Sequence, residues 1–379
     1  MFTLNRRSLI KMLGAGAVFG LAGTTATASR SDTTKSKNIP MIHATDLYRP
    51  HVDPDDHWDL ACVFALAYRG DIDLKAVLID FPPPRRRDVD PDVLAISQMN
   101  FVTGNKVPVV VGSSIAMRSP DDSQPDAPLS DRNGVSTVLN VLKNSTKPVV
   151  INITGSSRDI AVAGNQEPEL FAKKCMGIYL NAGTGSREKQ GPQRSEYNVT
   201  LDPLAYSAIF KLPCPVYWMP CFEKIEPQSE RHVMEHGTYY RFQQNDILPY
   251  LSDKMQKFVA YMLAKVTDND WLSYLLEEKD QALLHEFGTR YRNMWCTGGF
   301  FHAAGYTVTS EGRIMPLDQA PNKAVFAFEP ANITCTEKGV TTWLHNSTAR
   351  NRYIFHVLDT ENYQSAMTKA MKKLLMELP

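Results

Sequence analysis

The sequence predicts an α/β protein with an open, mostly parallel, doubly wound sheet and helices on both faces. Two observations support this fold class. Short, almost continuous apolar runs rich in β-branched residues recur along the chain, and stretches with helical periodicity separate them. Strands that are apolar on both sides belong in a parallel sheet covered on both faces. The 379 residues, 43% hydrophobic and 22% charged, suffice for one large domain of this kind.

Strands and helices are expected to alternate from the first strand onward. Strands are expected at 40–46, 74–80, 107–112, 148–154, 175–181 and 214–220. Helices are expected at 56–68, 91–103, 135–143, 158–163, 167–174 and 203–211. The stretch 223–300 is more helical, with amphipathic segments at 252–266 and 270–285, and strands at 324–328 and 353–358 precede a final helix at 361–377. This alternation is typical of a Rossmann-like fold.

The first 28 residues have the pattern of an export signal. Arg6 and Arg7 form a twin-arginine pair, an apolar run extends from Met12 to about Ala22, and small residues at 26–28 form a cleavage site. The apolar run is shorter than the roughly 20 residues that a membrane span needs. We therefore expect a signal peptide at 1–28, a polar leader at 29–38 and a single α/β domain at 39–379. The mature protein is expected in the periplasm or outside the cell, without membrane insertion.

The charge balance and the cysteines exclude several classes of protein. Lys and Arg number 41 and Asp and Glu 41, which argues against binding nucleic acid through bulk charge. The basic run 85–87 is followed at once by acids, so a solvated charged turn is favoured over a phosphate site. The six cysteines show no CxxC pair and no zinc-ligand spacing. Cys62 and Cys175 are expected in the core, and pairing of Cys214 with Cys221 after export is left open.

Polar side chains gather where the predicted strands end. Ligands of open parallel sheets bind beyond the carboxyl ends of the strands, where this chain has Asp46, Asp80, Thr154 and Asn181. Five carboxylates lie within fourteen residues after the first strand, and these are Asp46, Asp53, Asp55, Asp56 and Asp59. Carboxylates this close repel one another unless a cation lies among them, and Ca²⁺ prefers six to eight oxygen ligands. The alternative is a helix N-terminus with an excess of acids, because the helix dipole also favours them.

These residues resemble the inosine–uridine-preferring nucleoside hydrolases. The first strand of that family ends in an aspartate-rich motif, which TDLYRPHVDPDDHWDLA (45–61) resembles with a few inserted residues and with Ala44 at the position of the first aspartate. Four further segments are similar to family motifs in the same order: INITGSSRDIA (151–161), NAGTG (181–185), SEYNVTLDPLA (195–205) and IFHVLDTENYQSAMTKAM (354–371). The resemblance spans about residues 40–370 and implies a nucleoside hydrolase-like fold.

The resemblance also implies roles for particular residues. The metal ligands would be Asp46, Asp55, Asp56 and the Thr154 carbonyl, with Asp53 in reserve and Asn293 as a neutral oxygen donor. Asp46 would act as the general base. The ribose hydroxyls would be bound by Asp55, Asp80, Asn181, Glu196 and Asn198. If 196–198 is extended, Glu196 and Asn198 point to one side; the alternative is that Asn198 caps the turn before Asp202.

The late His-Asp pair of the family, in which His protonates the leaving base, has no counterpart in RYRNMWCTGGFFHAAG (290–305). His302 and Trp295 are the candidates to face the leaving group, and a hydrogen-bonded helical histidine is the simpler interpretation of His302.

Three functions remain open at this stage. The first is hydrolysis of the N-glycosidic bond of nucleosides or related ribosides by a Ca²⁺-oriented water. The second is a periplasmic, metal-dependent nucleoside- or sugar-binding protein that has lost turnover, which the missing His-Asp pair motivates. The third is hydrolysis of a different glycoside on the same scaffold. Each implies a small-molecule partner and no nucleic acid, and each leaves a homo-oligomer open.

Overall fold

The computed structural model describes residues 37–379, apart from 52–53, 187–194 and 320–321. The proposed signal peptide and most of the leader lie outside these residues. In the part of the chain that is described, no helix is both long enough and apolar enough to span a membrane.

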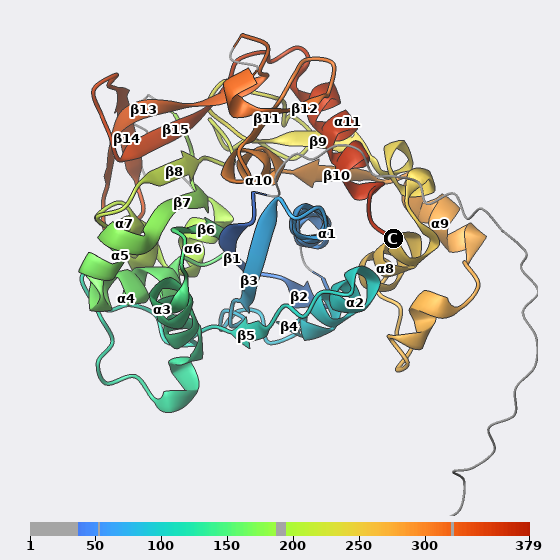
Figure 1. Cartoon of the computed structure of the whole chain (residues 1–379), viewed down its shortest axis with the longest axis horizontal. Helices are drawn as coiled ribbons and strands as arrows, with labels where there is room; N and C mark the ends of the chain where they lie inside the picture. The colour runs from blue at the N-terminus through green and yellow to red at the C-terminus, as the bar shows by residue number, and fades with distance from the viewer. Residues whose placement is uncertain (1–36, 52–53, 187–194, 320–321) are drawn as a thin grey trace, which may run out of the picture. The chain divides into compact units, whose positions relative to one another are not determined.

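A nine-stranded sheet forms the centre of the described chain (Figure 1). Seven strands are parallel, and from one edge inward they are β5 (Val109–Val111), β3 (Ile72–Ile79), β1 (Ile39–Thr45), β6 (Val149–Ile153), β7 (Cys175–Asn181), β8 (Val216–Met219) and β15 (Arg352–Val357). Two antiparallel strands, β13 (Phe326–Cys335) and β14 (Thr341–His345), complete the other edge. The predicted open, mostly parallel α/β sheet is thus confirmed.

The strand order places a crevice at one particular point of this sheet. From β1 the chain adds β3 and β5 on one side, and β6, β7 and β8 on the other. The connections therefore leave β1 and β6 in opposite directions, and a crevice opens beyond the carboxyl ends of these two strands. The pairing of Ala44 with Ile153 sets their register, and Thr154 N donates to Ala44 O at 2.8 Å. Asp46 and Thr154, the first residues after the two strands, are thereby brought together.

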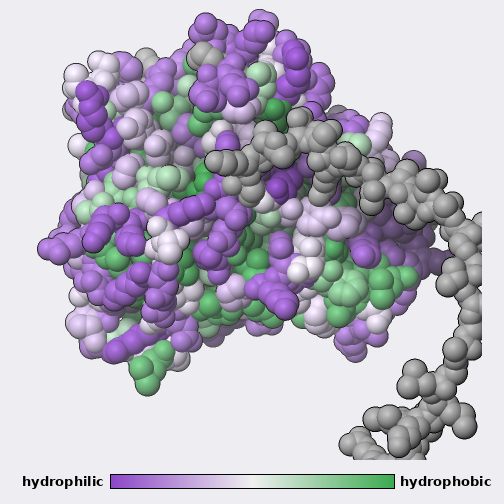
Figure 2. All heavy atoms as spheres, viewed as in Figure 1, coloured by the Kyte–Doolittle hydropathy of each residue, from purple (hydrophilic) through white to green (hydrophobic). Residues whose placement is uncertain are grey.

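Helices cover both faces of the sheet because successive strand residues point to opposite sides. In β1, Met41 packs into one hydrophobic core and Ile42 into the other. The first core includes residues of α1 (Asp55–Tyr68), α2 (Val93–Thr103), α8 (Asp253–Leu263), α9 (Gln281–Gly288), α10 (Thr297–Ala303) and α11 (Tyr363–Leu375). The second includes residues of α3 (Asn133–Asn144), α4 (Arg158–Gln166), α5 (Pro168–Lys174), α6 (Tyr197–Leu201) and α7 (Pro203–Ile209). Hydrophilic side chains predominate on the face in Figure 2.

Three short strand pairs accompany the main sheet. They are β2 (Tyr48–Arg49) with β4 (Asp90–Pro91), β9 (Tyr240–Gln243) with β10 (Tyr291–Met294), and β11 (Tyr306–Val308) with β12 (Ile314–Pro316). The sequence pattern predicted none of these pairs, because strands of two to four residues are too short to show a period.

Several expectations from the sequence are wrong in detail. The segment 270–285 is not one helix, since a 3₁₀ turn at Ser273–Leu276 is followed by α9, which begins at Gln281. The segment 196–198 is not extended, because α6 begins at Tyr197. Cys214 and Cys221 are both buried as free thiols rather than paired. Cys62 and Cys175 are buried, as expected of core residues.

Candidate functional site

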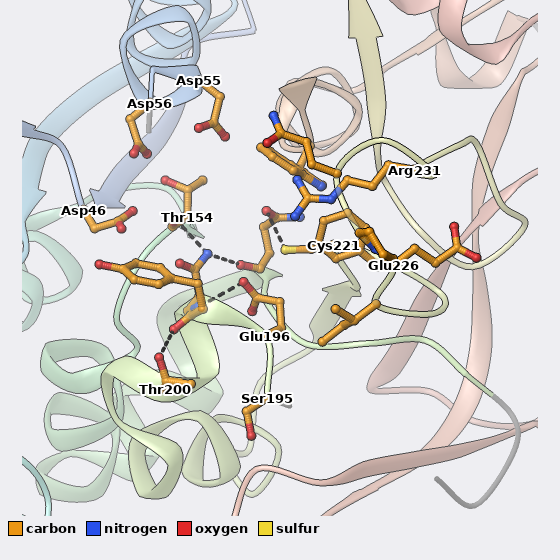
Figure 3. A pocket seen from close by; sticks show the side chains of 18 of the residues that line it. Asp46, Asp55, Asp56, Thr154, Ser195, Glu196, Thr200, Cys221, Glu226 and Arg231 are labelled. Atoms are coloured by element: carbon orange, nitrogen blue, oxygen red, sulfur yellow. Dashed lines mark hydrogen bonds between the residues drawn. The ribbon is translucent and has the colours of Figure 1, made fainter. Parts of the chain in front are cut away.

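A pocket of about 660 Å³ lies beyond the carboxyl ends of β1 and β6, at the switch point where the connections leave these strands in opposite directions (Figure 3). Asp46 follows β1, Thr154 follows β6, and Asp55 and Asp56 come from the first turn of α1. Figure 3 shows the three carboxylates on the side of the pocket where Thr154 lies. The fold therefore brings four of the proposed metal ligands to one pocket, at the strand ends where the sequence predicted a binding site. Asp53 lies outside the described residues.

The two acids of α1 are helical residues, not caps. The residue before the helix is Pro54, which makes no side-chain capping bond, and Asp55 and Asp56 lie in the first turn, so the alternative of a helix N-terminus rich in acids stays open beside the metal site. The side chain of Asp56 accepts a hydrogen bond from Thr45 Oγ1 at 2.9 Å, which ties the helix to the end of β1. The positive end of the helix dipole favours negative charge here.

The turn after β6 depends on a glycine. A Cβ at Gly155 would lie 2.4 Å from Asp80 Oδ2 and 2.6 Å from Asp46 N, so a side chain would displace one of them. Asp80 accepts a hydrogen bond from Ser156 N and is not among the described residues that line the pocket. Burial, with the nearby charge of Asp46, raises the pKa of Asp80 well above its usual range. Asp80 therefore supports the turn and is not placed to touch a sugar.

Glu196 caps α6 and lines the pocket. Its carboxylate accepts hydrogen bonds from Gly183 N at 2.8 Å, Asn198 N at 3.0 Å and Val199 N at 3.4 Å. Burial raises the pKa of the carboxyl, and these N–H donors act in the opposite direction. The same-side prediction for Glu196 and Asn198 fails as geometry, because both belong to a helix start, yet both reach the pocket.

Asn198 joins the ends of two strands. Its Nδ2 donates to Thr154 O at 3.1 Å and to Asn181 O at 3.0 Å, so it fixes the carbonyl that was predicted as a metal ligand. The side-chain hydrogen bonds of Asn198 therefore go to these two strand ends and not to the turn before Asp202, and Asp202 caps α7. Asn181 also lines the pocket, and its Nδ2 donates to Met219 O and Thr238 Oγ1 at 3.0 and 3.1 Å.

Of the three candidate site residues from 290–305, only one lines the pocket. His302 does not line the pocket: its Nδ1 lies 2.7 Å from Tyr179 Oη, and burial lowers its pKa to about 4. Asn293 accepts a hydrogen bond from Tyr239 Oη at 3.1 Å and does not line the pocket either. Trp295 does line it, in edge contact with Phe222. His302 as a catalytic group and Asn293 as a metal ligand are therefore withdrawn.

The donor set suits a hard divalent cation. The pocket offers three carboxylates, of Asp46, Asp55 and Asp56, that are only 5–8% exposed, together with the Thr154 carbonyl. Ionised carboxylates buried around one pocket repel one another unless a cation lies among them, and oxygen donors suit Ca²⁺. Among the described residues, a tighter group with ligand atoms within 4.8 Å of one another is formed by Asp55, Asp59 and Cys296. Asp59 was counted in the sequence cluster, and it lies fully buried.

The opposite wall of the pocket was not predicted. It comes from the segment between β8 and β9, which contributes Cys221, Phe222, Glu226 and Arg231. This segment contains no helix or strand, so it has no hydrophobic period that sequence analysis could detect. Arg85 also lines the pocket, whereas the sequence favoured a solvated turn. The rest of the run fits that expectation better, since Arg86 pairs with Asp88.

Comparison with known proteins agrees with the fold. The sequence matches no protein-family model and no curated protein sequence. Among solved structures, a purine-preferring ribonucleoside hydrolase from Gardnerella vaginalis is 14% identical, with a TM-score of 0.52 over 89% of this chain and 99% of that one. A plant nucleoside hydrolase is 14% identical, with a TM-score of 0.50 over 88% and 99%. The type III effector protein XopQ, solved with adenosine diphosphate ribose, is 15% identical, with a TM-score of 0.50 over 89% and 93%. The chain thus has a nucleoside hydrolase-like fold.

Proposed function

We propose that this protein hydrolyses the N-glycosidic bond of nucleosides or related ribosides with the help of Ca²⁺. The observation that carries the proposal is the pocket itself. It lies at the switch point of a nucleoside hydrolase-like sheet and combines a wall of buried carboxylates with a wall that contains the indole of Trp295. A sugar with its polar hydroxyls fits the first wall, and a planar base fits the second.

The chain's own groups divide the chemistry between them. Asp46, Asp55, Asp56 and the Thr154 carbonyl would hold Ca²⁺. The bound ion would orient a water and the ribose hydroxyls. Asp46 follows β1 and is part of this acidic wall, and its carboxylate would accept the proton of the attacking water. Cleavage of such a bond passes through a cation-like sugar, which the surrounding carboxylates stabilise.

In this proposal, ribose is held by residues at the start of α6 and by the first residue of α1. The carboxylate of Glu196 has lone pairs beyond those that its backbone donors use, and it can accept from a hydroxyl. Asn198 uses its Nδ2 on two carbonyls, which leaves its Oδ1 as an acceptor. Asp55 is the third group for the hydroxyls. Fixing the sugar in this way contributes orientation at the reacting carbon.

The leaving base is supported by aromatic contact and by one donor. The indole Nε1 of Trp295 is buried and has no hydrogen-bond partner among the described residues. An N–H in that state gains from an acceptor atom on the base. Trp295 therefore takes the place in the proposal that the sequence analysis left open between it and His302.

Ribose release tests the proposal. The mature protein is incubated with a panel of purine and pyrimidine ribonucleosides, with Ca²⁺ or with EDTA, and reducing sugar is measured. We expect release from at least one nucleoside, loss of release in EDTA, and a decrease of at least about a hundredfold in Asp46→Asn. Release that is insensitive to EDTA contradicts the role of the metal. The absence of release from every nucleoside contradicts the hydrolase.

A second candidate is a binding protein without turnover. The described residues that line the pocket include no histidine that could protonate a leaving base. The same panel distinguishes the two functions, because a nucleoside that binds tightly in calorimetry without ribose release selects the binding protein. Release from other glycosides added to the panel would select a different hydrolase on the same scaffold.

Export is proposed from the sequence. Arg6 and Arg7 belong to the signal, which lies outside the described residues. The double substitution Arg6→Lys with Arg7→Lys is expected to leave the precursor in the cytoplasm, as followed by cell fractionation. A double variant that still reaches the periplasm contradicts the twin-arginine route.

A further inference from the structure

Two arginines line the pocket from different parts of the chain. Arg85 belongs to the loop between β3 and β4, and Arg231 belongs to the segment between β8 and β9. In Figure 3, Arg231 lies across the pocket from Asp46, Asp55 and Asp56. The pocket therefore has cationic groups as well as an acidic wall, although the chain as a whole carries no net charge.

Each guanidinium is held over an aromatic ring of the same pocket. The Cζ of Arg85 lies 5.2 Å from the centroid of the Tyr197 ring, and its Nη2 donates to Thr200 Oγ1 at 2.8 Å. The Cζ of Arg231 lies 4.8 Å from the centroid of the Phe222 ring. Stacking on a ring orients a guanidinium while its edge N–H groups remain able to donate. Both guanidinium groups are therefore oriented by a ring. Beyond the bond of Arg85 Nη2 to Thr200, they keep N–H groups that can donate to a ligand.

Neither arginine forms an ion pair with another residue in the described ranges, and the neighbouring arginine provides the contrast. Arg86 donates from Nε and Nη2 to the carboxylate of Asp88, at 2.9 Å each. Arg231 has a buried Nε with no hydrogen-bond partner among the described residues. Glu226 is the acid that lines the same wall as Arg231, and its Oε2 lies 3.1 Å from His232 Nδ1. A buried guanidinium nitrogen without an acceptor costs free energy unless a ligand supplies one.

The geometry points to a substrate that carries a phosphoryl group on its ribose. A phosphoryl group has two charges and three acceptor oxygens, which match two guanidinium groups better than any neutral part of a nucleoside does. The acidic wall takes the ribose hydroxyls, and Arg85 and Arg231 take the phosphoryl oxygens. The inference rests on the proposed function for the place of the ribose, and it narrows the substrates to ribosides such as nucleoside monophosphates.

Binding of matched pairs of probes tests this inference without requiring turnover. The dissociation constants of AMP and adenosine, and of ribose 5-phosphate and ribose, are measured by calorimetry on the mature protein with Ca²⁺ present. Inorganic phosphate is included as a competitor, to separate a free-phosphate site from a riboside site. We expect AMP to bind at least about tenfold more tightly than adenosine, with an advantage that shrinks as salt is added.

Variants then assign the preference to the two arginines. Arg85→Met and Arg231→Met are each expected to reduce the ratio of AMP to adenosine affinity by about tenfold, and the Lys variants are expected to retain part of it. Arg86→Met is the matched control, because Arg86 lies beside Arg85 but pairs with Asp88, and it is expected to leave the ratio unchanged.

The outcomes separate this inference from the proposed hydrolysis. AMP that binds through Arg85 and Arg231, with no release of ribose or ribose phosphate from any nucleoside or nucleotide of the panel, supports the phosphoryl site and contradicts the hydrolase. Adenosine that is cleaved while AMP binds no better contradicts the phosphoryl site and supports the hydrolase. Inorganic phosphate that binds equally well and does not compete with adenosine also contradicts a phosphorylated riboside, as does failure of both AMP and ribose 5-phosphate to bind.

Discussion

Single residues of this pocket stabilise the fold and also line the cavity that the proposed ligand would occupy. Glu196 caps α6, with hydrogen bonds from Gly183 N and Asn198 N, and also lines the cavity. From the sequence alone, the same residue was expected to be a sugar ligand on an extended segment. The residue does line the pocket, but its backbone starts a helix and is not part of an extended segment. A glutamate that caps a helix and a glutamate that binds a sugar cannot be distinguished from the sequence alone.

Glu196→Ala is therefore expected to affect stability as well as binding. Loss of the cap and of a buried acceptor should lower the free energy of unfolding by about 1–2 kcal/mol, as measured by urea titration. Riboside affinity should decrease by about one to two powers of ten. Glu196→Gln, which keeps one oxygen acceptor, should recover part of the stability. An alanine variant as stable as the wild type contradicts the capping role.

Asp159 is expected to make the stability depend on pH. Burial raises the pKa of this carboxyl from 3.8 to about 6, although Ser113 N donates to it and Arg158 lies nearby. The folded state then binds a proton more tightly than the unfolded state does. The resulting stability is complete below pH 3.8 and is lost as the pH rises through about 6. Each unit of this shift corresponds to about 1.4 kcal/mol, so the loss amounts to about 3 kcal/mol.

The variant Asp159→Asn cannot titrate, and it provides the measurement. The difference in unfolding free energy between Asp159→Asn and the wild type should move in favour of the variant by about 2 kcal/mol between pH 4 and pH 8. Urea unfolding at several pH values gives this difference. A difference that stays constant over this range shows that Asp159 does not titrate with a raised pKa.

At the scale of elements, the predictable parts are those with a hydrophobic period. The strands of the parallel sheet are buried on both faces, so they read as continuous apolar runs, and β7 was placed at its observed bounds. The segment between β8 and β9 forms the other wall of the pocket, but it is held by its tertiary contacts. For example, Cys221 N donates to Gly183 O at 3.0 Å and Thr238 N donates to Pro220 O at 2.8 Å. Such contacts cross between distant parts of the chain and leave no local pattern, which is why Phe222 and Arg231 were missed.

Asp202 shows how one residue can join several elements near the site. Its Oδ1 accepts from Ala205 N at 3.1 Å and thereby caps α7. Its Oδ2 accepts from Arg158 Nε at the start of α4 and from Met117 N, both at 2.9 Å. The carboxylate is 2% exposed and the guanidinium 11%, so this is a buried ion pair.

Removal of this carboxylate should therefore be costly. Asp202→Ala is expected to lower the free energy of unfolding by about 3–5 kcal/mol, because it leaves Arg158 buried without its acid. The exposed pair of Asp121 with Lys211 offers a matched control, and Asp121→Ala should change stability by at most about 0.5 kcal/mol. Similar effects of both substitutions in urea titration would contradict the role given to burial.

At the scale of the whole molecule, the order of strands decides where the chemistry can occur. The sequence indicated which residues end strands, but strand order depends on contacts between distant segments, and it was not predicted. Only the observed order shows that β1 and β6 are neighbours and that Asp46 and Thr154 line one pocket, which Asp80 does not line. Asn293 and His302 were assigned by their position along the chain, and the fold places both outside the pocket wall.

Binding of Ca²⁺ should stabilise the folded protein as a whole. The carboxylates of Asp46, Asp55 and Asp56 come from two segments that meet only in the folded state, so the ion should bind the native chain and not the unfolded one. A ligand at a hundredfold excess over its dissociation constant adds about 2.7 kcal/mol to the free energy of unfolding. The midpoint of thermal unfolding should therefore rise by several degrees in about 1 mM Ca²⁺ relative to EDTA. The rise should be smaller in Mg²⁺, because Mg²⁺ loses its water reluctantly. Asp46→Asn and Asp56→Asn should each reduce this rise, because each removes a charged ligand.

Asp88→Asn, at an exposed carboxylate that pairs with Arg86, should leave it unchanged. A midpoint that does not respond to Ca²⁺, or variants at Asp46 and Asp56 that respond as the wild type does, would show that the acidic wall holds no such ion.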